Sequence, residues 1–120
     1  MKSSKLYKEI KRIILAFGYS IEGLKAALGE AAFRIELIIA IIALPISFMV
    51  THNTAERALL IGSLFLVMIV ELLNTAVEIA INRISLETHP LSKKAKDVAS
   101  GAVFLSIINA IAIWLVILWN

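Results

Sequence analysis

Two glutamates and two asparagines lie at helical spacing within the apolar run 59–81 and just beyond it. Glu71, Asn74 and Glu78 stand at i, i+3 and i+7, and Asn82 continues the row. At about 100° per residue, the first three share one helix face. A carboxylate in hydrocarbon is costly and usually faces a bundle interior or a polar pathway. The spacing predicts a site for a cation, a proton transfer or both; the alternative for Glu71 is a protonated structural carboxyl bonded to a neighbouring helix.

Further charged residues lie where the apolar segments begin. Glu30 and Glu36 flank Arg34 before one segment, and Lys96 and Asp97 precede the last. Carboxylates hold Mg²⁺ and lysine neutralises phosphate, so such a cluster suits a divalent cation with a polyphosphate. The common nucleotide-binding motifs are absent from the sequence. The residues alone therefore leave a transporter, a proton channel and an interfacial transferase open.

The composition indicates an all-α membrane protein. The 120 residues are 60% hydrophobic with a mean hydropathy of +0.90, and the lack of cysteine excludes disulfide and thiolate chemistry. Seven of the twelve Lys and Arg residues lie in 1–35 and four more in 83–96. This distribution predicts a multi-pass protein with its N-terminus in the cytoplasm. Nucleic-acid binding is disfavoured because the basic clusters flank hydrophobic segments without interleaved aromatics.

The elements that must position these residues form a single domain, 1–120. An amphipathic surface helix or helix pair is expected in region 1–30, bent near Gly18 and Gly23 and attracted to anionic lipid. Transmembrane spans are expected at about 35–51, 57–84 and 97–119. Asn53 or Thr54 is a candidate N-cap, and 85–96 reads as a polar cytoplasmic loop. Trp114 fits an aromatic belt at the outer face.

Residues 71–83, ELLNTAVEIAINR, resemble the E-x-x-N-[ST]-[SA]-x-E-x-x-x-D motif of the prokaryotic diacylglycerol kinases. GEAAFRIE at 29–36, HPLSKKAKDVASGAV at 89–103 and FGYSIEGLKAA at 17–27 are similar to three further segments of that family. The resemblance covers about 12–119. It implies that a homotrimer with active sites shared between subunits phosphorylates a lipid hydroxyl with ATP and Mg²⁺, giving phosphatidic acid at the cytoplasmic face of a bacterial inner membrane.

The resemblance also implies residue roles. Glu71 matches the family's catalytic base, and Glu30 and Glu78 match its magnesium ligands. Ser100 and Trp114 on the last span are expected to contact the lipid substrate, Ser100 through its ester carbonyls. The nucleotide-binding positions are expected to be Arg12, Tyr19, Ser20, Asn74, Asn82, His89, Lys96 and Asp97.

Two positions depart from the family pattern. Asn82 replaces the last acid of the motif, which removes a charge near the nucleotide, and Lys93 replaces a glycine before A-K-D. A second branch of the family phosphorylates undecaprenol. The stretch RISLETHPLSKKAKD and the tryptophan in IWLVILW look closer to the diacylglycerol branch, so diacylglycerol is the expected substrate and undecaprenol the alternative.

Overall fold

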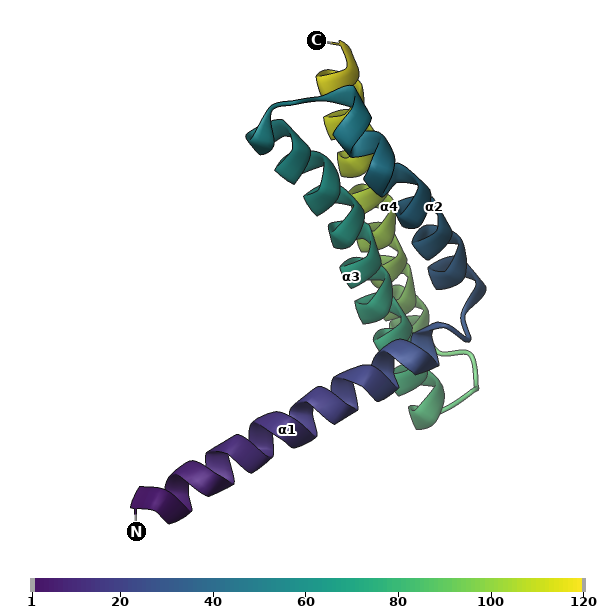
Figure 1. The fold of residues 1–120 in the computed structure, drawn as a ribbon. Coiled ribbons are helices and arrows are strands. Elements are labelled where there is room, and N and C mark those ends of the chain that lie inside the picture. Colours follow the sequence, from purple (N-terminus) through teal and green to yellow (C-terminus); the bar gives the residue numbers. More distant parts are fainter. Residues whose placement is uncertain (1, 120) are drawn as a thin grey trace.

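The computed structural model describes residues 2–119, which form four helices and no strand (Figure 1). They are α1 (Lys2–Ala27), α2 (Ala31–Val50), α3 (Thr54–Ile84) and α4 (Pro90–Trp119). Helices α2, α3 and α4 are long and apolar enough to cross a membrane. The predicted all-α fold with three possible spans is therefore confirmed.

Helix α1 leaves the other three helices and projects away from them (Figure 1). It runs without interruption through Gly18 and Gly23, so of the expected helix or helix pair the single helix is observed, with no break at these glycines. Sharp kinks need a cause such as proline or a side chain inserted in the backbone ladder. No atom lies within 4 Å of where a Cβ would stand at either glycine. Nothing packed against these positions therefore forces the helix to change direction.

Helices α2, α3 and α4 form an antiparallel bundle in which α3 packs against both neighbours, most extensively against α4 (Figure 1). The buried apolar side chains are few and include Phe33 on α2, Leu60 and Val67 on α3, and Ile117 on α4. Most large apolar side chains of the bundle point outward. This is expected where lipid, as apolar as leucine, replaces water around the helices.

Three buried serines, one on each helix of the bundle, bond to their own helix. The hydroxyls of Ser47, Ser63 and Ser106 donate to the carbonyl three residues earlier, at 2.6, 2.7 and 2.7 Å respectively. A hydroxyl satisfied in this way needs no partner on another helix. The helices therefore approach closely at small residues without polar bonds from these serines between them.

The α2–α3 turn, residues 51–57, joins the two helices through a compact hydrogen-bonded network. The Asn53 side chain accepts from the Glu56 backbone N–H at 2.9 Å, which confirms Asn53 as the N-cap. The Thr51 hydroxyl donates to the Glu56 carboxylate at 2.6 Å. Arg57 donates to the Thr51 carbonyl at 2.8 Å, and its guanidinium lies 4.4 Å from the centre of the Phe48 ring. The turn is thus fixed largely by its own residues.

The connection between α3 and α4 is shorter than the predicted loop 85–96, because α4 begins at Pro90. Proline suits the first helical position, since its fixed φ matches the helix and its missing N–H would lack a partner there. His89 precedes it, and its Nδ1 accepts from the Leu91 backbone N–H at 3.1 Å. Residues 90–96 are therefore helical, and Lys93 and Lys96 project from a helix rather than from a loop.

Candidate active site

The polar row on α3 passes from a buried to an open environment. Glu71 and Asn74 are only 6% and 9% exposed, whereas Glu78 and Asn82 are exposed. Within the row, the Asn74 amide donates to Glu78 Oε1 at 3.3 Å. Glu71 and Glu78 are about 10 Å apart along the helix axis at 1.5 Å per residue. The predicted shared face is present, with Glu71 deepest.

Glu71 meets a second carboxyl, that of Glu36 on α2, within hydrogen-bonding reach. Glu36 Oε2 is buried and has no hydrogen-bond partner. Arg34, which flanks Glu36 in sequence, turns away and donates to the Leu28 carbonyl at 2.9 Å. Sequence reasoning placed Glu36 beside Arg34 and did not pair it with Glu71. The signal that could have indicated a buried role for Glu36 was its position more than one turn inside an apolar helix.

An apolar groove of about 450 Å³ opens between α2, α3 and α4, with Glu36 among its lining residues. Trp114, predicted to contact the lipid, also lines it and presents a buried indole N–H that has no partner. The groove thus offers an apolar wall, and the two unpaired polar atoms are buried within its lining residues. The other lining residues are Ile39, Ala40, Ala43, Leu64, Val67, Ile107, Ala110, Ile111 and Leu115.

A smaller polar hollow of about 260 Å³ lies at the turn between α3 and α4. Three predicted nucleotide-binding residues, His89, Lys96 and Asp97, line it together with Lys93. Lys96 donates to Asn82 Oδ1 at 2.7 Å, and Lys93 pairs with Asp97 at 2.6 Å. The structure therefore brings four of the predicted residues to one end of the bundle. The Lys93–Asp97 pair was missed because 93–97 was not expected to be helical throughout.

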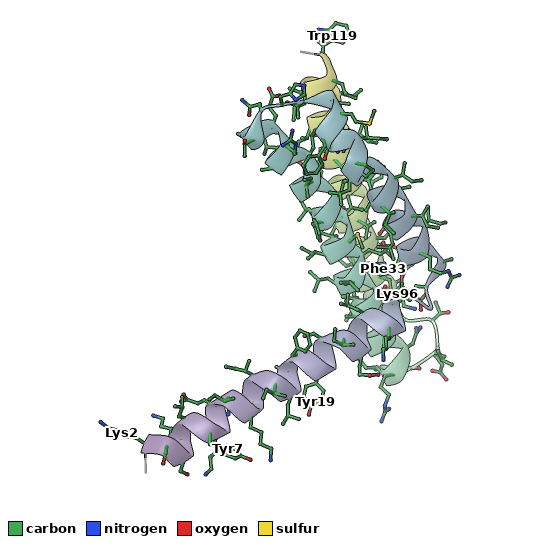
Figure 2. The ribbon with its side chains drawn as sticks, in the orientation of Figure 1. Lys2, Tyr7, Tyr19, Phe33, Lys96 and Trp119 are labelled. Atoms are coloured by element: carbon green, nitrogen blue, oxygen red, sulfur yellow. The ribbon has the colours of Figure 1, made fainter. Side chains whose placement is uncertain are left out.

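Other predicted residues lie apart from this end. Arg12, Tyr19 and Ser20 are exposed on α1, where Arg12 and Tyr19 line a hollow of about 320 Å³ with Lys8, Lys11, Leu15 and Ala16. Figure 2 shows Tyr19 on the projecting helix, away from Lys96. The Ser20 hydroxyl donates to the Ala16 carbonyl at 3.0 Å. One chain therefore does not assemble all the predicted nucleotide-binding residues.

Two remaining candidates, Glu30 and Ser100, are exposed. Glu30 occupies the N-cap position of α2 without a side-chain cap bond, so its carboxylate is not used within that helix end. Across residues 2–119, no group of three His, Asp or Glu side chains gathers closely enough to hold a metal ion. The open Glu78 carboxylate and the buried, unpaired Asn74 Oδ1 are nevertheless the hard oxygen donors that Mg²⁺ prefers.

Comparison with known proteins identifies the family. Residues 18–118 match the family model described as prokaryotic diacylglycerol kinase. The chain is 46% identical to a diacylglycerol kinase of Pseudomonas aeruginosa and 47% identical to that of Escherichia coli K12, each over 110 residues. These alignments cover 91% of this chain and 89% and 90% of the relatives. A diacylglycerol kinase of Haemophilus influenzae is 41% identical over 106 residues, 88% of this chain and 90% of that protein. The chain belongs to the prokaryotic diacylglycerol kinase family.

Proposed function

We propose that this protein transfers the γ-phosphoryl group of ATP to the free hydroxyl of diacylglycerol, giving phosphatidic acid. The observation that carries this proposal is the polar row on α3. It places a buried carboxylate, Glu71, about one turn from Asn74, whose amide donates to the open carboxylate of Glu78. A lipid hydroxyl in the apolar groove and a nucleotide at the polar hollow would approach this row from its two ends.

Glu71 acts as the general base in this proposal. A hydroxyl is a weak nucleophile, and a carboxylate within reach accepts its proton as the oxygen attacks the γ-phosphorus. The apolar groove holds an acyl chain, with Trp114 in its wall. Ser100 is exposed on α4 and offers its hydroxyl to the ester region.

Glu78 and Glu30 hold Mg²⁺, with Asn74 close to the phosphates. The metal, when bound, neutralises the charge that develops on the phosphoryl oxygens. Lys96 and Asp97 contact the nucleotide, with His89 and Asn82 beside them in the same part of the structure. Because Asn82 already accepts a bond from Lys96, the amide replaces the family's acid in orienting this lysine.

The N-terminus and the α3–α4 turn lie on the cytoplasmic side of the bacterial inner membrane. The excess of lysine and arginine at these two places supports this orientation. Helix α1 lies on the membrane surface, since its apolar residues recur at helical spacing while Arg12 and Tyr19 occupy the opposite face. In that position Arg12 and Tyr19 face the cytoplasm, where nucleotide is available, and Ser20 lies about 100° round the helix from Tyr19.

The functional unit is a homotrimer with active sites shared between subunits. Arg12 is about 22 Å from the end of α1 at 1.5 Å per residue, and that helix projects away from its own bundle. These residues of α1 therefore contribute to the active site of a neighbouring chain. We expect Glu71→Gln and Glu30→Ala subunits, each inactive alone, to recover activity when mixed. Absence of recovery despite demonstrated subunit exchange would mean that each site lies within one chain.

The decisive test of the reaction uses purified protein in mixed micelles with ATP and Mg²⁺. We expect a short-chain diacylglycerol to be phosphorylated much faster than undecaprenol at equal mole fraction, because only the glyceride has ester carbonyls for the polar groups to bond. Faster turnover of undecaprenol would assign the protein to the other branch. Proton or cation flux without formation of a phosphorylated lipid would instead support a channel or transporter.

A further inference from the structure

The mechanism above leaves Glu36 without a role, although its carboxyl meets that of the base. We propose that Glu36 is a positioning residue: its protonated carboxyl donates a hydrogen bond to the Glu71 carboxylate and holds it at the groove. The proposal deepens the proposed lipid kinase function and rests on Glu71 being its base. It assigns to α2 the task of orienting a catalytic group carried by α3.

The geometry of the pair supports this role. Glu36 lines the apolar groove from α2, while Glu71 on α3 is 6% exposed. Glu36 Oε2 is buried and has no hydrogen-bond partner. Buried polar atoms without a partner are rare in folded proteins and call for an explanation. A proton held between the two carboxyls supplies the missing partner, because it makes one of them a donor to the other.

Electrostatics requires such a proton. Two ionised carboxylates in contact and shielded from water repel strongly, and pairs of this kind hold one proton between them. The nearby cation, Arg34, bonds to the Leu28 carbonyl, and its side chain is exposed. The shared proton belongs on Glu36 in the resting enzyme, because Glu71 must be free to accept another.

The reaction step balances with this assignment. The lipid O–H bond breaks and its proton passes to Glu71, while an oxygen–phosphorus bond forms and the bond from the γ-phosphorus to the ADP oxygen breaks. The carboxyl pair then carries two protons, and one returns to water as the products leave. Glu36 keeps its own proton throughout and never touches the phosphoryl group.

Two substitutions at Glu36 separate this role from packing. Glu36→Gln keeps an N–H donor toward Glu71, so we expect kcat within a few-fold of the unmodified protein. Glu36→Met keeps the side-chain volume but removes the donor, and we expect kcat to fall about 100-fold, as small misplacements of catalytic groups do. The KM for MgATP should not change in either variant. Equal activity of the two variants, whether both high or both low, would overturn the proposal.

Infrared spectroscopy tests the proton without relying on turnover. The unmodified protein in lipid at neutral pH should show the C=O band of a protonated carboxyl, and Glu36→Gln should lose it. Glu22→Gln is the matched control, since Glu22 on α1 pairs with Lys25 at 3.8 Å and is well exposed; its spectrum should keep the band. Persistence of the band in Glu36→Gln would overturn the proposal even if the protein phosphorylates another lipid. If Glu36→Gln loses the band but the unmodified protein has no kinase activity, the proposed function is wrong and the protonated carboxyl pair stands.

Discussion

Similar polar residues lie near the two ends of α3, but they differ in whether their polar atoms are bonded within the protein. At the α2–α3 turn, Thr51, Asn53, Glu56 and Arg57 bond to one another or to nearby backbone within seven residues. In the half nearer the α3–α4 turn, Glu36 and Asn74 each keep a buried oxygen without a partner. The α2–α3 turn has one such atom, the Nε of Arg57, although that guanidinium is bonded through another nitrogen.

This difference separates polar residues that fix a fold from those that take part in a reaction. Bonds between residues close in sequence stabilise a turn and leave nothing for a ligand. Buried groups with free bonding capacity are costly to the fold, by about 1–3 kcal/mol each, and such groups are concentrated where another molecule supplies the partner. The unpaired oxygens of Glu36 and Asn74 therefore support the proposal that the reaction takes place in the half of the bundle nearer the α3–α4 turn.

The largest expected effect is that of Glu71→Gln on lipid phosphorylation. Removing the base should lower kcat by at least about 100-fold, in the range typical of general bases. The helix content and thermal unfolding should be unchanged, because the amide fits the same space and can bond to Glu36. Initial rates of phosphatidic acid formation measure the loss. Substantial activity in the folded variant would remove Glu71 from the role of base.

The matched control is Glu56→Gln, a change of the same kind on the same helix within the α2–α3 turn. Its lost charge weakens the bond from Thr51 and the favourable interaction with the N-terminal end of α3. We expect the free energy of unfolding to decrease by about 1 kcal/mol, with kcat unchanged. A loss of activity comparable to that of Glu71→Gln would end the distinction between the two regions.

A smaller effect is expected for Glu78→Ala on nucleotide binding. Glu78 is exposed at the open end of the row and accepts only the long 3.3 Å bond from Asn74. If it holds the metal, the apparent dissociation constant for MgATP should rise by about tenfold or more. Calorimetric titrations at several magnesium concentrations should show this dependence. A change in affinity that is equal with and without magnesium would place Glu78 outside the metal site.

Local patterns predicted the fold and part of the site. Hydrophobic length located α2, α3 and α4, and helical spacing placed Glu71 and Asn74 on one buried face. The N-cap at Asn53 followed from residue type beside an apolar run. Each of these features depends on a few consecutive residues, which is why sequence was sufficient.

Features that depend on contacts between helices were not predicted. The meeting of Glu36 and Glu71 requires the relative height of α2 and α3, which no local pattern contains. The early start of α4 was missed because Pro90 was read as a loop residue, although proline is well suited to a first helical turn. The glycines of α1 were expected to bend that helix, but glycine permits a bend without causing one.

The inward bonding of Ser47, Ser63 and Ser106 also affects how a lipid finds the enzyme's reactive end. A substrate reaches this protein by lateral diffusion and samples the bundle surface before it reaches Glu71. A hydroxyl that is buried and bonded to its own helix does not bind a lipid head group during this diffusion. Serine is therefore tolerated at these positions in the membrane, because its hydroxyl is not accessible to the lipids that diffuse past the bundle.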